Sequence, residues 1–331
     1  METVFGLRQL TAHWPTTDVV VCASPALLST AVASFRLRYG VRRPPFGIWI
    51  QDLYSLGVAE TGTLGGRGAR MATRLERSVL ASADGLAVIH ENFADYVTSR
   101  LSIPSDRVSV IRNWTHIVPT SLSNRAAVRR SYGWRDDEFI VLHAGNIGVK
   151  QGLENVVEAA QVAQSRASRV RFVLLGDGNQ RPALEAQARG IDSISFIDPL
   201  PNGRFEEALA AADVLLVNEK VGVGQMSVPS KLTSYFAAER PVLASVDSTS
   251  ITAKEILDAG AGLVVSSGNP AALVDAAERL SDNIALADEF GHAGLAFTRE
   301  KLSRDSSLDA FELWLEQLVL ARSTNERTRQ R

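Results

Sequence analysis

The stretch FIVLHAGNIGVKQG, residues 139–152, decides the fold class of this 331-residue chain. Its first four residues are apolar, a glycine-bearing turn follows, and the turn leads into a helical pattern. A short apolar strand, a polar turn and a helix in this order form the first half of a βαβ unit. The stretch therefore predicts a parallel sheet with helices on both faces.

The same alternation extends outward from this stretch through most of the chain. In the second half, strands are predicted at residues 139–143, 170–175, 193–197, 214–217, 242–245 and 263–265. In the first half, strands are predicted at residues 19–22, 47–51, 86–89 and 108–111, with helices at 26–39, 67–81 and 92–101. This pattern predicts an α/β protein with two Rossmann-like, doubly wound domains, of which the first is shorter.

A segment with little periodicity separates the two halves. Residues 112–124 contain Pro119 and several Ser and Thr, as is typical of a linker. We therefore predict an N-terminal domain over residues 1–123, a C-terminal domain over 124–300, and a C-terminal helix with a polar tail over 301–331. A hinge in the linker would let the two domains face each other across a cleft.

The C-terminal helix has its own apolar pattern. Within the helical pattern of residues 307–321, one stripe carries Leu308, Phe311, Leu315 and Leu318. We expect this stripe to pack on another part of the protein. The residues from Arg322 onward are polar and are predicted to fray.

Composition excludes several classes of protein. Hydrophobic residues make up 45% of the chain and charged residues 22%, which is typical of a globular protein and not of a disordered one. The formal net charge of −2 gives no global field that would attract nucleic acid, so no nucleic-acid partner is expected. The single cysteine, Cys22, excludes an internal disulfide. The five scattered His residues have no metal-ligand spacing, so no metal is predicted.

The N-terminal residues give no sign of secretion. Residues 1–10 include Glu2 and Arg8 and lack the apolar run of a signal peptide, which predicts a cytoplasmic protein. The longest uncharged run, residues 19–35, contains Pro25 and several Ser and Thr. A buried strand followed by a helix explains this run better than a membrane span does.

Three loops of the second half follow predicted strands, and ligands of an open parallel sheet bind beyond the carboxyl ends of the strands. The first loop carries Gly145, Asn146, Gly148 and Lys150, and the second carries Gly176 and Asp177. The third loop leads into a helix and carries Gly224, Ser227, Ser230 and Lys231.

These residue types suit a phosphate. Glycines let the backbone approach an anion, a helix N-terminus presents free N–H groups, and each lysine adds a full charge. Two such loops in one domain suit a diphosphate. The alternatives are a glycine-bearing connection with a solvent-facing Lys150, a common turn composition at Gly176 and Asp177, and a solvated first-turn Lys231.

Two basic groups lie in the first half. Arg67, Arg70, Arg74 and Arg77 recur at helical spacing and form one stripe, while Arg36, Arg38, Arg42 and Arg43 follow the preceding helix. Such groups can hold a protein on an anionic membrane surface. The alternative is a solvated face that Glu76 partly neutralises.

Several motifs together resemble the family 4 glycosyltransferases, in particular bacterial capsule and exopolysaccharide enzymes of the colanic-acid type. In the second half they are residues 145–148, 151–152, 176–178, 228–231 and 235–245. In the first half they are residues 49–54, 83–84 and 110–114. The resemblance covers nearly the whole chain.

The resemblance implies a GT-B fold, in which the C-terminal domain holds a nucleotide diphosphate sugar and the N-terminal domain shapes the acceptor site. It implies retaining transfer to a glycan, often lipid-linked, on the cytoplasmic side of the membrane and without a bound metal or other cofactor. Lys150 and Lys231 would stabilise the departing diphosphate, and Asn146 would contact a phosphate oxygen. Asp52 would bind a hydroxyl of the acceptor or sugar, and Gly176 and Asp177 would lie near the nucleotide.

The chain departs from the family pattern in two ways. Ser234 stands where the family's paired-glutamate motif has a carboxylate, and the earlier glutamate position falls near Gln225 or Met226. Family members also begin with a further βαβ unit, so the N-terminal domain is expected to be incomplete. These departures support a rival interpretation, a catalytically silent, truncated binding protein. A second rival is a nucleotide-sugar epimerase of the same fold, which is disfavoured because the sequence shows no cluster of acidic and His residues for proton abstraction.

Overall fold

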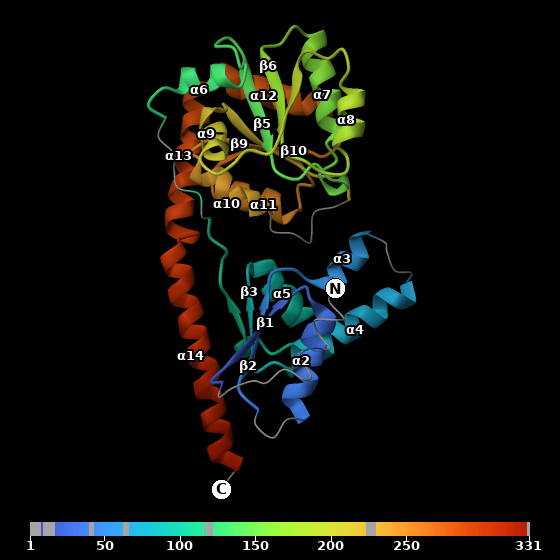
Figure 1. Cartoon of the computed structure of the whole chain (residues 1–331), viewed down its shortest axis with the longest axis vertical. Coiled ribbons are helices and arrows are strands. Elements are labelled where there is room, and N and C mark those ends of the chain that lie inside the picture. Colours follow the sequence, from blue (N-terminus) through green and yellow to red (C-terminus); the bar gives the residue numbers. More distant parts are fainter. Residues whose placement is uncertain are drawn as a thin grey trace. The chain divides into compact units, whose positions relative to one another are not determined.

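The computed structural model describes residues 8, 17–39, 43–61, 66–115, 117, 122–222 and 230–329, without the side chains of 58–61 and 321–329. The chain divides into two compact units, shown in Figure 1. The first unit comprises Met1–Asn113 and Arg304–Arg331, and the second comprises Trp114–Ser303. The boundary between them lies inside the segment expected to be a linker.

The first unit contains a four-stranded parallel sheet. Its order is β1 (Val20–Ser24), β2 (Phe46–Ile50), β3 (Gly85–Val88) and β4 (Val108–Val110). The connections contain α2 (Leu27–Tyr39), α3 (Tyr54–Thr61), α4 (Gly66–Ser82), α5 (Glu91–Ser99) and the 3-10 turn η1 (Ser105–Arg107). Because the strands advance in one direction and such crossovers are right-handed, these helices cover one face of the sheet.

The last helix, α14 (Arg304–Arg329), covers the opposite face of this sheet. Its Trp314 and Leu318 are nearly fully buried, with exposed fractions of 3% and 4%. They lie over Gly47 and Gly85, which are directly paired on β2 and β3. A Cβ atom on Gly47 would lie 2.6 Å from the Trp314 ring, so the close approach requires glycine.

Two expectations for the end of the chain need correction. The helix continues to Arg329, whereas the sequence predicted a frayed polar tail from Arg322. The predicted stripe packs on the sheet through Phe311, Leu315 and Leu318, but Leu308 is 41% exposed. Trp314 takes the central position because it lies one helical turn before Leu318 and also three residues after Phe311.

The second unit contains a six-stranded parallel sheet in the order β10-β9-β8-β5-β6-β7. The strands are β5 (Phe139–Ala144), β6 (Val170–Leu175), β7 (Ile194–Ile197), β8 (Val214–Asn218), β9 (Val242–Val246) and β10 (Gly262–Ser266). Numbered along the chain, this is the Rossmann order 3-2-1-4-5-6. The direction of winding reverses between β5 and β8, which are neighbours in the sheet.

Helices cover both faces of this sheet, as Figure 1 shows. They are α6 (Arg125–Ser131), η2 (Val149–Gln151), α7 (Glu154–Ser165), α8 (Arg181–Gln187), α9 (Arg204–Ala211), α10 (Ser230–Ala237), α11 (Ile251–Asp258), α12 (Pro270–Asp282) and α13 (Ile284–Lys301). Alternate residues of β5 enter two cores: Ile140 and Leu142 pack with Tyr235 and Phe236, while Val141 packs with residues of α7 and α12. All ten predicted strands are present, with ends that differ by at most two residues.

Candidate functional site

The candidate site lies at the carboxyl edge of the second sheet, where β5 and β8 are adjacent. The loops that follow these strands diverge at the point where the winding reverses, and this is where open α/β sheets bind ligands. The loop after β5 contains the turn η2, and the loop after β8 begins with Glu219 and Lys220.

The end of β8 holds the loop after β5 through three successive carbonyl groups. The Lys220 N–H donates to the Lys150 carbonyl oxygen at 2.9 Å. The Asn218 side-chain amide donates to the carbonyl oxygens of Gln151 at 2.7 Å and Gly152 at 2.9 Å. These bonds fix the backbone of the turn relative to the sheet.

Two further features support this arrangement. The Asn155 amide on α7 donates to the Asn218 side-chain oxygen at 2.8 Å and to the Ser245 hydroxyl at 3.1 Å, and all three side chains are buried. Gly152 has a φ of +54°, and a Cβ atom there would lie 2.8 Å from the Lys220 Cα. A glycine is therefore needed where the two loops touch.

The loops after β5 and β6 are also joined to each other. The Ile147 N–H donates to the Asp177 carbonyl oxygen at 2.9 Å. A Cβ atom on Gly176 would lie 1.9 Å from the Gly145 carbonyl oxygen, and one on Gly178 would lie 2.3 Å from that of Ile147. The predicted second loop thus lies against the first, and the backbone contact itself accounts for its glycines.

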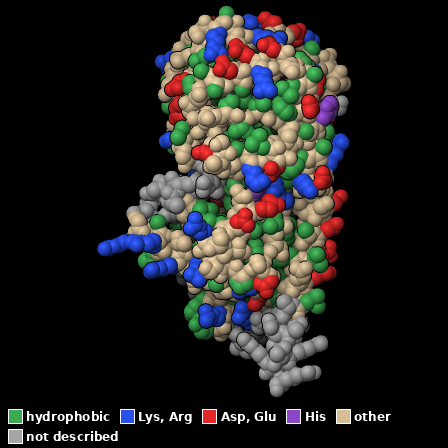
Figure 2. Space-filling model, turned by 180° about the vertical axis from the view of Figure 1, so that it is seen from behind, with side chains coloured by type: hydrophobic (Ala, Val, Ile, Leu, Met, Phe, Trp, Pro, Cys, Tyr) green, Lys and Arg blue, Asp and Glu red, His purple; other side chains and the backbone are tan. Residues whose placement is uncertain are grey.

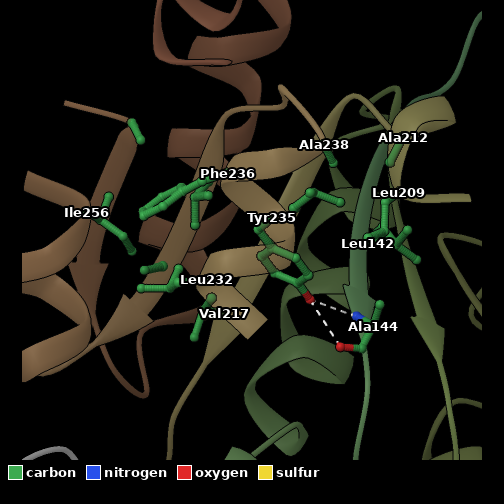
Figure 3. Close-up of a cluster of buried hydrophobic side chains, with 14 of the residues drawn as sticks. Leu142, Ala144, Leu209, Ala212, Val217, Leu232, Tyr235, Phe236, Ala238 and Ile256 are labelled. Carbon is green, nitrogen blue, oxygen red and sulfur yellow. Dashed lines mark hydrogen bonds between the residues drawn. The ribbon is translucent and has the colours of Figure 1, made fainter. Parts of the chain in front are cut away.

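Helix α10 brings Lys231 to the same place. Lys231 is the second residue of the helix, and its Nζ lies 3.9 Å from where a Cβ atom on Gly145 would be. One turn later, the Tyr235 hydroxyl accepts from the Ala144 N–H at 2.9 Å and donates to the Ala144 carbonyl oxygen at 3.2 Å (Figure 3). Burial raises the pKa of Tyr235, so the phenol keeps its proton and holds α10 to the end of β5.

Burial controls the charges around Lys231. It lowers the pKa of Lys231 to about 8, and the nearby carboxylate of Glu219 opposes part of that shift. Burial and the charge of Lys231 hold the pKa of His143 well below its usual range, so this imidazole is neutral at pH 7. The Thr252 hydroxyl on α11 donates to Glu219 Oε1 at 2.5 Å. Glu219 therefore supplies the negative charge that faces Lys231.

The remaining predicted residues of this edge occupy different environments. Asn146 and Lys150 are exposed, whereas Gly148 is buried and its N–H donates to the Gln151 side-chain oxygen at 3.1 Å. Asp177 is exposed, and its carboxylate accepts from the Gly178 N–H at 2.7 Å. Ser230 begins α10 and is exposed. Gly224 and Ser227 lie outside the described residues.

Asp52 lies in the first unit, directly after β2. Its Oδ1 accepts from the Leu53 N–H at 2.9 Å, and the Ser24 hydroxyl donates to its carbonyl oxygen at 2.9 Å. Next to it, the side-chain amides of Gln51 and Asn113 bond to each other in both directions, at 2.9 and 3.3 Å. The carboxyl ends of β2 and β4 are thus linked by a pair of amides.

Sequence reasoning assigned no role to three consecutive residues, Asn218, Glu219 and Lys220. They follow the apolar run of residues 214–217, but polar residues follow the other strands as well, so no local signal singles them out. Lys220 joins Lys150 and Lys231, and these are three of only five lysines in the chain. Among the residues that the structure describes, no three His, Cys, Asp or Glu side chains gather as a metal site.

Two family models match the chain. The model described as "Glycosyl transferases group 1" matches residues 138–283, which include the lysine-bearing sheet edge. The model described as "Glycosyl transferase 4-like domain" matches residues 1–114, which include the first sheet. The chain belongs to the family 4 glycosyltransferases.

Two curated relatives of this family 4 chain illustrate its similarity. It is 32% identical over 193 residues to WcaI of Escherichia coli K12, whose name places it in colanic acid biosynthesis as a glycosyl transferase. That match covers 57% of this chain and 46% of WcaI, so the chain spans about half the length of that relative. It is 27% identical over 318 residues to the glycosyltransferase WbjE of Pseudomonas aeruginosa, covering 92% of this chain and 75% of WbjE.

Solved structures bear out the architecture. HepE of Anabaena, determined in complex with UDP, superposes with a TM-score of 0.75 at 14% identity, covering 95% of this chain and 81% of HepE. With two parallel α/β units, the family 4 chain therefore has the GT-B fold that the sequence resemblance predicted.

Proposed function

We propose that this chain moves a sugar from a nucleoside diphosphate donor to a glycan acceptor, with retention of configuration at the anomeric carbon. The observation that carries the proposal is that Lys150, Lys220 and Lys231 belong to the loops and the helix that meet at the β5–β8 edge, with the Lys231 Nζ beside Gly145. A surplus of positive charge at this edge suits a diphosphate. Family membership supports the same reaction class.

Each part of the edge has a task in this proposal. As the bond between sugar and diphosphate breaks, negative charge grows on the departing diphosphate, and lysines already in place stabilise it more than they stabilise the donor. Lys231 acts most strongly because it is partly buried, whereas Lys150 and Lys220 are exposed. Lys150 and Asn146 would contact phosphate oxygens from the exposed side of the loop after β5. The proposal includes no bound metal and no other cofactor.

The acceptor side of the proposal rests on the first unit. Asp52, at the end of β2, would bind a hydroxyl of the acceptor or sugar. The likeness to WcaI, named for colanic acid biosynthesis, supports a role in the synthesis of a cell-surface polysaccharide such as a capsule or exopolysaccharide. In this proposal the glycan acceptor is lipid-linked.

The same proposal places the chain at an anionic cytoplasmic membrane surface. Its stripe of Arg67, Arg70, Arg74 and Arg77 is exposed along α4, and Figure 2 shows basic side chains projecting there. Glu76 does not neutralise the stripe, because it is buried and accepts from the N–H groups of Tyr54 and Ser55 at the start of α3.

Exposed apolar side chains accompany the stripe. On α4, Met71 is 74% exposed and Leu75 39%, and on the adjacent α2, Phe35 is 60% exposed and Tyr39 70%. Arginines beside exposed apolar groups suit the interface of an anionic bilayer. Among the described residues, no helix is long and apolar enough to cross a membrane.

Vesicle sedimentation tests this placement. The chain is expected to sediment with phosphatidylglycerol-containing vesicles and not with pure phosphatidylcholine vesicles. The double substitution Arg70→Glu and Arg74→Glu should abolish sedimentation. A matched double substitution in the second unit, Arg189→Glu and Arg299→Glu, changes the net charge equally and should have little effect. Equal losses in both double variants would reject the α4 surface.

Nucleotide binding and donor turnover test the reaction. Calorimetric titration with UDP, GDP, ADP and dTDP, with and without EDTA, should reveal one preferred base and an affinity that the chelator does not change. The matching sugar nucleotide should then release free nucleoside diphosphate, faster when a glycan acceptor is added. A folded chain that binds none of the four would overturn the proposal. Binding without any turnover would favour a silent binding protein, and an isomerised sugar nucleotide would favour an epimerase.

A further inference from the structure

A polar cavity of about 240 Å³ lies at the amino end of the first sheet. Its lining includes Ser34, Arg38, Arg43, Phe46, Ala81 and Ser82. Phe46 is the first residue of β2, whereas Asp52 follows the end of the same strand. The cavity and the residue assigned to the acceptor therefore lie at opposite ends of the sheet.

The negative groups around this cavity already have partners. Helix α4 ends here, and Arg107 donates to the Ala81 carbonyl oxygen at 3.2 Å. Arg43 Nη2 donates to the Ser82 carbonyl oxygen at 3.3 Å and to Asp84 Oδ1 at 3.3 Å. The end of the helix and the one nearby carboxylate thus need no further cation.

Positive groups at the cavity still lack acceptors. Arg43 Nε is buried and has no hydrogen-bond partner among the described residues, which calls for an acceptor from outside the folded chain. Arg38 is exposed, and its guanidinium makes no hydrogen bond or ion pair with the part of the chain that the structure describes. The Ser34 hydroxyl lies 2.6 Å from Ser82 Oγ and can turn toward a ligand. Two guanidinium groups and a hydroxyl around one cavity suit a phosphate, which offers several acceptor oxygens.

The cavity adjoins the surface of α2 and α4 that is proposed to contact a membrane. Ala81 follows Arg77 by four residues and Arg74 by seven, so it continues the arginine stripe to the end of α4. On α2, Arg38 lies between Leu37, which also lines the cavity, and Tyr39. The Tyr39 ring packs on that of Phe35 with centroids 4.7 Å apart, and both rings are exposed. A cationic cavity beside exposed aromatic rings suits a phosphate that carries an apolar chain.

We propose that this cavity binds the phosphodiester group of an anionic phospholipid. The inference rests on the proposed membrane placement for the source of the phosphate, but not for the cavity itself. Arg38 and Arg43 donate to the phosphate oxygens, and Phe35 and Tyr39 contact the apolar part of the lipid. The arginine stripe attracts the chain to any anionic surface, and the cavity adds a preference for a phosphate-bearing lipid.

A soluble lipid tests the cavity without a membrane. Dihexanoylphosphatidylglycerol, kept below its micelle concentration, should bind the wild-type chain at a saturable site in calorimetric titration. Arg38→Gln removes a donor without breaking a contact of the described residues, and it should weaken binding at least about tenfold. Ala81→Phe retains every charge but fills the cavity from an exposed helix position, and it should weaken binding as much.

Each variant has a matched control. Arg189→Gln makes the same change in charge at an exposed position of the second unit. Ser78→Phe adds the same ring at an exposed position of α4 that does not line the cavity. Both controls should bind the soluble lipid as the wild type does. An absence of saturable binding in the folded wild type, or equal affinity in all five proteins, would overturn the cavity as a lipid site.

Inorganic phosphate and vesicles distinguish the possible sources of the phosphate. Inorganic phosphate should bind more weakly than dihexanoylphosphatidylglycerol because it has no apolar part to contact Phe35 and Tyr39. Phosphate binding that depends on Arg38 and is as tight as that of the lipid would overturn the lipid as the occupant. If the soluble lipid binds through Arg38 but the chain does not sediment with phosphatidylglycerol-containing vesicles, the cavity stands and the proposed membrane placement is rejected.

Discussion

Replacing Lys231 with methionine should stabilise the second unit although it removes a side chain from the candidate site. The pKa of Lys231 falls from the usual 10.5 to about 8, a difference that corresponds to about 3 kcal/mol at 1.36 kcal/mol per pH unit. This is the net free energy by which burial, partly offset by Glu219, penalises the charged form. Methionine has a similar length and no charge, so Lys231→Met should recover at most about 3 kcal/mol at pH 7, or roughly 6–10 °C in melting temperature.

The gain in stability of Lys231→Met should depend on pH in a characteristic way. Between pH 8 and 10.5 the folded chain has released the Lys231 proton while the unfolded chain still binds it. The free energy of unfolding of the wild type therefore rises with pH across this window, and the penalty is fully present only below pH 8. Lys231→Met lacks this rise, so its advantage should be largest at pH 7 and small at pH 10.

Scanning calorimetry at pH 7, 8.5 and 10 measures the gain, with Lys254→Met as the control. Lys254 is exposed on α11 and pairs with Asp258 on the same helix, and such surface pairs contribute little, so its replacement should change stability by less than about 0.5 kcal/mol at each pH. Lys231→Met should also weaken nucleoside diphosphate binding at least about tenfold, or about 1.4 kcal/mol. A destabilised variant, or an advantage that is the same at pH 7 and 10, would refute the account of Lys231 as a desolvated cation.

Three further substitutions test the packing of the loops and of α14. Gly152→Ala should lower the free energy of unfolding in urea by at least about 1 kcal/mol more than Gly260→Ala does. Both glycines have a φ near +55°, but only a Cβ atom at position 152 would collide with the backbone of another loop. Equal losses in the two variants would mean that the loops do not touch. Asn218→Ala should cost about 2–4 kcal/mol and speed amide exchange in residues 149–152, since two carbonyl groups lose their donor; unchanged exchange there would show that other bonds hold the turn. Gly47→Ala should cost about 1–3 kcal/mol and shift tryptophan fluorescence to the red by displacing the Trp314 ring, and an unchanged spectrum would contradict the close contact.

The strands were predictable because each is a short apolar run between polar turns, and burial on both faces of a parallel sheet imposes that pattern. The order of the strands within the sheet could not be predicted in this way. β8 lies beside β5 although some seventy residues separate them, and no local pattern records that pairing. Lys231 could be singled out from its own loop. Asn218 and Lys220 could not, because they bond to the loop after β5, and that contact depends on β8 lying beside β5.

The same limit explains two expectations about individual residues. The glycine at position 176 was assigned to ligand binding, but its lack of a side chain is also required by the Gly145 carbonyl oxygen 1.9 Å from where a Cβ would be. Glu76 was expected to neutralise part of the arginine stripe if the stripe is a solvated face, and that part is wrong because its carboxylate is buried and accepts from the start of α3, while the four arginines are exposed. At both positions a contact between segments far apart in the sequence determines what the residue does. The spacing of residues along one helix or loop cannot predict such a contact.

The choice of lysine at the sheet edge follows from its chemistry. The chain contains thirty arginines and five lysines, and three of the five lysines belong to the loops and the helix at this edge. Arginine serves in paired, hydrogen-bonded positions, as at Arg181, which pairs with Glu185 and Asp198 and donates to the Gly176 carbonyl oxygen, and at Arg129, which donates to Asp213 and three backbone carbonyl groups. An arginine at position 231 would stay charged whatever its surroundings, and its planar group would need several acceptors that a shielded position offers only when a ligand is present. A lysine needs fewer partners, and the carboxylate of Glu219 favours its protonated form. The site can therefore remain shielded from water before the donor binds and still meet the diphosphate with a full positive charge.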